Sequence, residues 1–340
     1  MSNLDFIVAK VRGMRGNLYE GERLRRLCEF SSIEDLAARL APHEPIGSAV
    51  ALQRSLTARH VDELHRILRH LDGWEAEMLT WMLRRHQVEN LKVLLRAWAA
   101  KAGEETLAAY TVELPPPLDL PMKKLAASAS MEELVAAIPV ERIKEGALLG
   151  LGDFEESGRL FFIEAGMDKA YLNELHNVAG QAAGDTRAHV LKLVMLELDI
   201  YNVMSVIRAL FNYSIIFNKI RPFLAPFGAS VAMNIVDDVR NAPDPDTAAS
   251  LIPASLTGRH NRPLSANEVE SAMWNTLYHV ANRLYYTAVL DFGAVAAFHY
   301  VKRIELANLV RISECVRYGE SGDTVRHKLM QLPATELVGV

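Results

Sequence analysis

The sequence has 340 residues, of which 50% are hydrophobic and 23% are charged. This composition is ordinary for a globular protein and excludes a largely disordered chain. The formal net charge is −5, from 37 basic and 42 acidic residues, so we expect no nucleic-acid partner. No uncharged run approaches the roughly 18 residues of a membrane-spanning helix. The two cysteines, Cys28 and Cys315, are far apart in the sequence and typical of a reduced cytosolic protein.

The N-terminal segment predicts two short helices separated by a turn. Residues 7–27 combine apolar and basic side chains at helical spacing, and the turn is expected between Gly16 and Gly21. Ser31 or Ser32 can cap a further helix, because a serine hydroxyl accepts a hydrogen bond from the first turn. The acidic residues that follow would stabilise the N-terminus of this helix, where negative charge is favourable.

Helical periodicity dominates the rest of the chain. Apolar residues recur at three- and four-residue steps in 79–98, 191–207 and 271–316, and the alternation typical of strands is hard to find. Two segments interrupt this pattern. Residues 114–121 contain four prolines and cannot be helical, while 240–265 are rich in Pro, Ser, Asp and Gly. We expect an all-α fold in which both segments are linkers or long surface loops.

One pattern recurs near the end of each block that these linkers separate. An acid or amide precedes an asparagine by three residues on an amphipathic helix, in 84–96, 196–208 and 301–313. Residues three apart share a helical face, so each block presents a polar pair beside an apolar stripe. The pairs are Gln87/Asn90, Asp199/Asn202 and Glu305/Asn308; Arg96 and Arg208 follow in the first two blocks, whereas the third has Glu314 there and Arg311 one turn earlier.

The repeated pattern predicts a triplicated protein. Its three helical lobes would cover residues 1–118, 119–222 and 223–340, joined in one compact unit about a pseudo-threefold axis. The alternative is that long amphipathic helices look alike without any common organisation. A generic helical-repeat scaffold is a further class, but its repeats are ~34–47 residues long, against a period of roughly one hundred residues here.

Signatures of catalysis are scarce. The phosphate-binding loop requires a Gly-Lys pair, which the sequence lacks. We therefore assign no catalytic residue, no cofactor and no metal site. One motif supports an alternative function, because Asp237-Asp238 resembles the aspartate-rich motif with which all-helical isoprenoid synthases hold Mg²⁺ against a diphosphate. The simpler interpretation is the last turn of a helix entering a loop.

Three segments resemble the C-subunit family of the V/A-type ATPases, whose member in the eukaryotic complex is called the d subunit. They are VRGMRGNLY…SSIEDLAARL within residues 11–40, ELDIYNVMSVIRAL at 197–210, and FHYVKRIELANLVRISECVRYG at 298–319. The resemblance spans essentially the whole chain. Gln87, where an acid is expected, and the divergent linkers depart from the family pattern.

The resemblance implies an all-helical funnel of three similar subdomains that is not itself a catalyst. Its partners would be the central-stalk subunits and the membrane rotor (c/K-type) ring, on the cytoplasmic face of a rotary ATPase that couples ATP hydrolysis or synthesis to proton or sodium transport. We expect the polar positions to line the funnel and some of them to reach the stalk: Arg12, Arg15, Gln87, Asn90, Arg96, Asp199, Asn202, Arg208, Glu305, Asn308 and Arg311. The alternative is that these residues tie neighbouring helices together within the protein.

Overall fold

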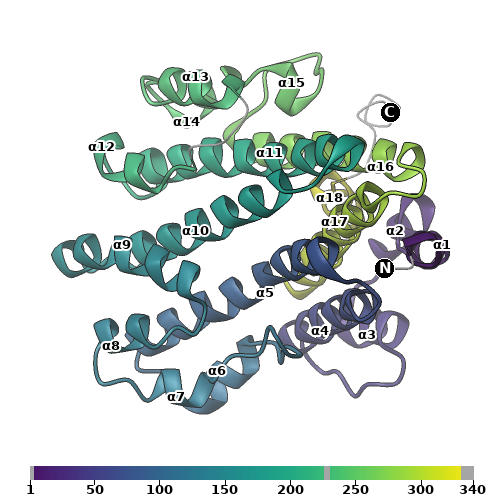
Figure 1. Cartoon of the computed structure of the whole chain (residues 1–340), viewed down its shortest axis with the longest axis horizontal. Helices are drawn as coiled ribbons and strands as arrows, with labels where there is room; N and C mark the ends of the chain where they lie inside the picture. The colour runs from purple at the N-terminus through teal and green to yellow at the C-terminus, as the bar shows by residue number, and fades with distance from the viewer. Residues whose placement is uncertain (1–3, 226–229, 331–340) are drawn as a thin grey trace.

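The structure, a computed structural model, describes residues 4–225 and 230–330 (Figure 1). Within these ranges every regular element is a helix, which confirms the all-α prediction. The α-helices are α1 (Leu4–Arg15), α2 (Gly21–Leu27), α3 (Ile33–Leu40), α4 (Ala49–Leu68), α5 (Gly73–Ala99), α6 (Glu104–Tyr110), α7 (Met122–Ala126), α8 (Met131–Ala136), α9 (Glu141–Ser157), α10 (Phe161–Gly180), α11 (Gly184–Ile207), α12 (Phe217–Ile220), α13 (Ser230–Val239), α14 (Pro245–Ser250), α15 (Ala254–Thr257), α16 (Ala266–Thr287), α17 (Phe292–Arg317) and α18 (Gly322–Lys328). A π-helical turn, η1 (Arg208–Asn212), follows α11, and a 3-10 turn, η2 (Arg221–Phe223), follows α12.

The N-terminal helices form as the sequence predicts. A turn separates α1 from α2, and Gly21 opens α2 with a φ of +53°, a conformation that favours glycine. Ser32 caps α3 by accepting a hydrogen bond from the main-chain N–H of Asp35. The carboxylates of Glu34 and Asp35 lie in the first turn of α3, where their negative charges interact favourably with the positive end of the helix dipole.

Three helical hairpins form the body of the molecule. We call them hairpin 1 (α4 and α5), hairpin 2 (α10 and α11) and hairpin 3 (α16 and α17). Within each hairpin the two helices pack against one another, and a tight turn joins them. Gly73 and Gly184 open the second helix of the first two hairpins with a φ of +55°. The third hairpin has Leu290 at this turn with a φ of +58°.

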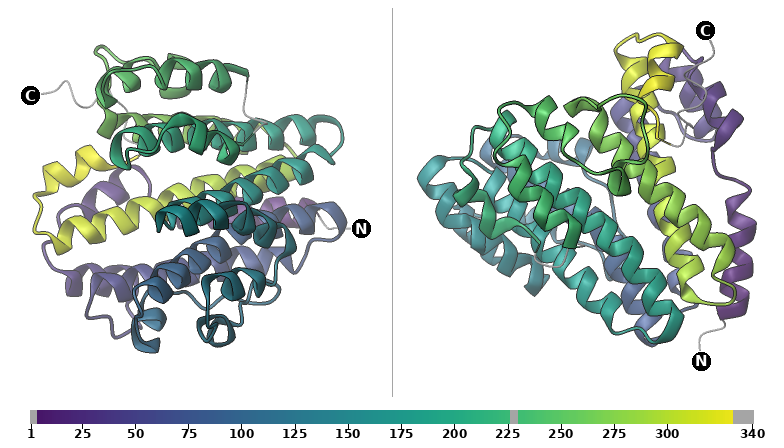
Figure 2. Two further views of the ribbon diagram at one scale, coloured as in Figure 1. Left: turned by 90° about the vertical axis from the view of Figure 1, so that its left-hand side faces the viewer. Right: turned by 90° about the horizontal axis from the view of Figure 1, so that it is seen from above.

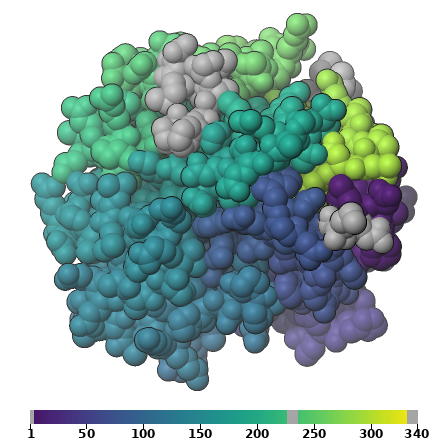
Figure 3. All heavy atoms as spheres, viewed as in Figure 1, coloured from purple at the N-terminus to yellow at the C-terminus, as the bar shows by residue number. Residues whose placement is uncertain are grey.

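The hairpins contact one another in cyclic order. α5 packs against α10, α11 against α16, and α17 against α4, so the last hairpin of the chain closes on the first (Figure 2). The helix α1 lies against α17, and α18 also packs against α17. The N-terminal helices and the C-terminal part of the chain therefore form one side of the molecule (Figure 3).

The two predicted linkers have different structures. Residues 114–121 are not helical, as predicted, and connect α6 to α7. The prediction of a loop over 240–265 is wrong in part, because the short helices α14 and α15 lie within it. Asp244 caps α14 and Pro245 occupies its first turn, where a missing amide N–H costs no helical hydrogen bond.

A close helix crossing fixes α9 on α10. A Cβ atom added at Gly150 would lie 2.2 Å from the main-chain oxygen of Phe162, and one at Gly146 would lie 2.3 Å from that of Gly166. Only glycine allows the two backbones to approach this closely. Gly152, on the same helix, has no heavy atom within 4 Å of such a Cβ.

Candidate partner-binding cavity

A cavity of about 690 Å³ lies between hairpin 1, α6 and α17. Polar and charged side chains from four helices surround it. They are Gln53, Arg54, Thr57, Arg85, His86, Glu89, Asn90, Tyr110, Arg303, Arg311 and Glu314. Of the predicted polar residues, Asn90 and Arg311 lie in this wall. Tyr110 is 56% exposed, so the cavity has an accessible rim.

Ion pairs hold the hairpin 1 side of the cavity in place. Arg85 contacts Glu89 at 2.5 Å on its own helix and Asp168 of α10 at 3.0 Å. Lys92 also contacts Asp168, at 2.7 Å. Desolvation would raise the pKa of Glu89, but Arg85 and Lys92 outweigh it and lower that pKa to about 2. Glu89 is therefore a carboxylate at any physiological pH.

The long helices α11 and α17 are joined through residues at one repeated position. Arg85, Glu197 and Arg303 each lie five residues before the repeated asparagine. Arg303 contacts Glu197 at 2.5 Å, and the hydroxyl of Tyr300 donates to Glu197 at 2.7 Å. Glu197 is 4% exposed. A buried carboxylate at this depth requires such partners, so α11 and α17 are joined by charge where they meet, while Arg85 pairs with Glu89 and with Asp168 of α10.

The three asparagines make the same contact in each block. Asn90, Asn202 and Asn308 each accept from the main-chain N–H and donate to the main-chain oxygen of one residue downstream. That residue lies 22, 23 and 22 positions further along the chain. The clamped residues are Val112, Ala225 and Met330, and all six hydrogen bonds are 2.6–3.0 Å long. We call this contact the asparagine clamp.

The residues three positions before the clamps are buried but differ in their contacts. Gln87 donates to the main-chain oxygen of Leu118 at 3.1 Å and accepts from Arg84. Asp199 is fully buried. Glu305 accepts from the main-chain N–H of Tyr19 at 2.6 Å, and burial raises its pKa. The contacts of Gln87 and Glu305 lie within the chain.

The arginines after the clamps join successive hairpins. Arg96 of α5 makes two hydrogen bonds, of 2.7 and 2.6 Å, to Glu164 of α10. Arg208, directly after α11, contacts Glu270 of α16 at 2.7 Å. At the third junction a glutamate replaces the arginine, and Glu314 of α17 accepts a hydrogen bond from Gln53 of α4 at 2.6 Å. These three contacts follow the cyclic order of the hairpins.

Sequence reasoning missed the acceptors at these junctions. Glu164 and Glu270 are 106 residues apart, the same separation as Asn202 and Asn308. That spacing is the signal that could have identified them. Gln53 lies one position away from the place that the repeat spacing assigns to the third acceptor, so the spacing does not identify it.

The remaining predicted residues occupy two different surroundings. Arg15 contacts Glu20 at 2.9 Å, donates to Asn282 at 2.7 Å, and lies over the ring of Tyr285. It thereby attaches α1 to α16. Arg12 is exposed on α1, and Arg311 donates to the main-chain oxygen of Lys328. Whether any of the eleven predicted residues reaches a partner stays a prediction.

Three histidines lie together beside the cavity. His60 and His299 are buried and His86 is half-buried. The ring centroids of His60 and His86 are 5.1 Å apart, and those of His60 and His299 are 6.3 Å apart. Desolvation is the main cause that lowers all three pKa values, that of His86 to about 4, with a further contribution from nearby cations such as Arg303. The three rings are therefore neutral at physiological pH.

The aspartate pair of the alternative function lies on the surface. Asp237 and Asp238 are exposed in the last turn of α13, and Asp237 contacts Arg240 at 3.4 Å. Within residues 4–225 and 230–330, no three His, Cys, Asp or Glu side chains gather in a way that could hold a metal ion. None of the described helices is long and apolar enough to cross a lipid bilayer.

The fold defines an all-α protein of three packed helical hairpins, with a cavity of mixed polar and apolar lining between hairpin 1, α6 and α17. A sequence profile of the ATP synthase (C/AC39) subunit family matches residues 7–328. Because this match covers nearly the whole sequence, the chain belongs to that family.

Similar proteins carry the same family name. The A-type ATP synthase C subunit of Methanosarcina barkeri is 27% identical over 228 residues, a match that covers 61% of this chain and 59% of the relative. The protein of the same name from Methanothermobacter thermautotrophicus is 22% identical over 91% of this chain and 83% of the relative. That of Haloquadratum walsbyi is 23% identical over 97% and 99%, respectively. The chain thus spans about three fifths of the first of these relatives and nearly all of the last.

Proposed function

We propose that this chain is the non-catalytic coupling component of a rotary V/A-type ATPase. It would link the central stalk to the membrane rotor ring on the cytoplasmic side, so that ATP hydrolysis or synthesis is coupled to proton or sodium transport. Family membership and the name of the relatives, as C subunits of A-type ATP synthases, support this assignment.

The observation that carries the proposal is the asparagine clamp in three equivalent places. A part that transmits torque must not deform, and each clamp fixes a loop to a long central helix through two buried or half-buried hydrogen bonds. The repeated separation of 22 or 23 residues supports three related lobes, which we propose to form a funnel about a pseudo-threefold axis. Of the predicted lobes 1–118, 119–222 and 223–340, the second would extend at least to Ala225, because Asn202 clamps that residue.

The cavity rim is the surface that we propose for the stalk. Arg54 and Tyr110 are exposed there, and Glu314 and Arg311 are half-buried. These side chains can change partners without unfolding the protein. Asn202 and Asn308, in contrast, are fully buried and would act by keeping the frame rigid.

The test reverses one charge on the rim. Arg54→Glu should weaken binding of the stalk subunits by about tenfold, ~1.4 kcal/mol, in a salt-dependent way, because rim charges act mainly on association. In the assembled complex, ATP-driven ion pumping should fall while ATP hydrolysis continues and the melting temperature stays the same.

Arg159→Glu is the matched control. Arg54 and Arg159 are both exposed and each donates to one main-chain oxygen, at 2.8 and 2.6 Å, but Arg159 is not part of the cavity wall. If both variants bind the stalk like the unchanged protein, the rim is not the binding surface. If both weaken binding equally, the effect is not specific to the cavity.

A further inference from the structure

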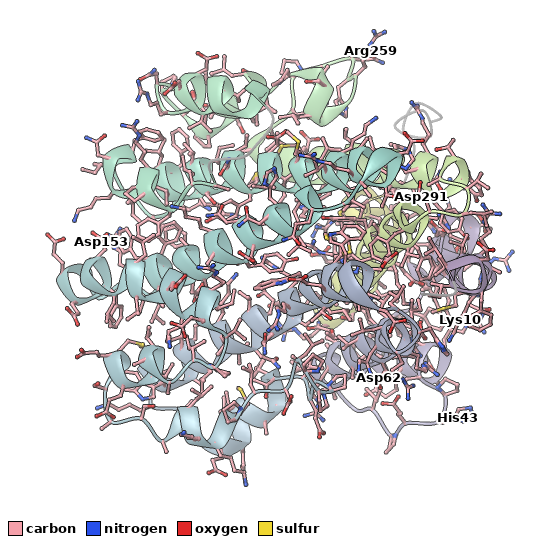
Figure 4. The ribbon with its side chains drawn as sticks, in the orientation of Figure 1. Lys10, His43, Asp62, Asp153, Arg259 and Asp291 are labelled. Carbon is pink, nitrogen blue, oxygen red and sulfur yellow. The ribbon has the colours of Figure 1, made fainter. Side chains whose placement is uncertain are left out.

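A second hollow, of about 540 Å³, opens between α1, α3, α4 and α17. It lies across the α4–α17 junction from the cavity described above and belongs to the side of the molecule that carries Lys10 (Figure 4). Its size falls within the ~300–1,000 Å³ range of small-molecule sites. The proposed coupling function makes no use of it.

Positive charge exceeds negative charge in its wall. Four cationic side chains line the hollow, against two carboxylates: Lys10, Arg59, Arg66 and Lys302 face Glu63 and Glu305. Lys302 contacts both carboxylates, at 2.6 and 3.8 Å. With four cations against two carboxylates, the wall carries a formal excess of two positive charges.

The three remaining cations have no carboxylate partner among the described residues. Arg59 donates to the main-chain oxygen of Leu40 at 2.6 Å, which leaves most of its guanidinium N–H groups available. Among the described residues, Arg66 donates to the main-chain oxygen of Asp62, at 3.4 Å. Lys10 lies above the ring of Phe6. Three cations without a carboxylate partner among the described residues therefore line one hollow.

The wall also contains a buried polar group without a partner. His60 is 3% exposed, and neither of its ring nitrogens makes a hydrogen bond within the described residues. Burial lowers its pKa, and the nearby cation of Lys302 lowers it further. The rest of the wall includes the apolar residues Met14, Leu18, Leu40, Leu56, Leu306 and Leu309.

We propose that this hollow binds a small anion that carries a phosphate group. Arg59 and Lys10 would contact the phosphate, because a planar guanidinium beside an ammonium matches its oxygens and its double charge. A phosphate also satisfies more N–H donors than a single carboxylate does. The apolar wall gives room for an organic part of the molecule, so the phosphate is either free or attached to a compact organic group.

Isothermal titration calorimetry of the full chain at low salt tests the proposal with three probes. Inorganic phosphate and AMP share the phosphate group, and adenosine lacks it. We expect phosphate, AMP or both to bind, and adenosine not to bind. Tighter binding of AMP assigns an organic phosphate, whereas equal binding assigns free phosphate. Absence of binding by both phosphate probes, or equal binding of AMP and adenosine, overturns the proposal.

Two variants and one control locate the binding. Arg59→Gln and Lys10→Gln should each raise the dissociation constant about tenfold or more, as expected for loss of a charge-assisted contact. Arg159→Gln removes an arginine that likewise donates to a main-chain oxygen, but outside the hollow, and should leave the affinity unchanged. Circular dichroism and melting temperature check that each variant is folded. Affinities that are unchanged in both hollow variants would refute the assignment.

Discussion

Replacement of Asn202 by alanine should destabilise the protein far more than replacement of Asn90. Both side chains clamp one downstream residue through two hydrogen bonds. The clamped residues differ in burial, because Ala225 is fully buried whereas Val112 is half-buried. After Asn202→Ala, the N–H and the oxygen of Ala225 would remain buried without partners.

The size of the difference follows from those unsatisfied groups. A buried donor or acceptor without a partner costs about 1–3 kcal/mol, so Asn202→Ala should cost ~2–5 kcal/mol. At Val112 water can replace the lost partner, and Asn90→Ala should cost only ~1–2 kcal/mol. The two variants remove the same atoms, so the comparison isolates the burial of the clamped residue.

Urea unfolding and hydrogen exchange measure the effect. The unfolding midpoint should fall more for Asn202→Ala than for Asn90→Ala. In Asn202→Ala the peptide that contains Ala225 should exchange faster, because its amide loses its only acceptor among the described residues. Equal midpoints for the two variants would show that burial of the clamped residue does not determine the strength of the clamp.

Three further perturbations have expected outcomes. Gly150→Ala should lower the melting temperature markedly, since its Cβ would lie 2.2 Å from a main-chain oxygen of α10, whereas Gly152→Ala should leave it unchanged or raise it; equal melting temperatures would refute the close crossing. Glu197→Ala should cost ~3–5 kcal/mol in urea unfolding by leaving Arg303 without its buried partner, and a cost below about 1 kcal/mol would contradict that pairing. The pKa of His86 is lowered from 6.5 to about 4, so the unfolded chain takes up a proton at a higher pH than the folded protein does. The contribution of the neutral ring to stability is therefore complete above pH 6.5 and is lost as the pH falls toward 4. His86→Gln should flatten the profile of stability against pH over that window, and an unchanged slope would contradict this reasoning.

The equivalence of the three asparagines could be predicted because each lies on a long amphipathic helix, three residues after an acid or an amide. Their acceptors could not, because a main-chain N–H and oxygen 22 or 23 residues away have no side-chain signature. The helix α14 was not predicted, for a different reason. Pro245 indicates a break in the chain, yet it is compatible with the first turn when Asp244 supplies the cap. The position of the cavity could not be predicted from the sequence, because it depends on which helices pack against one another in the fold.

The junction between hairpins 3 and 1 has a consequence for how the chain folds. Gln53 and Glu314, which meet there, are 261 residues apart, and the contact between Arg15 and Asn282 spans 267. Contacts of such sequence separation carry the largest loop-closure entropy and form late. During synthesis the surfaces of α1 and α4 that face α17 stay uncovered until nearly the whole chain has left the ribosome. The nascent chain therefore exposes an apolar edge for most of its production, and a product truncated before α17 has nothing of its own to cover it.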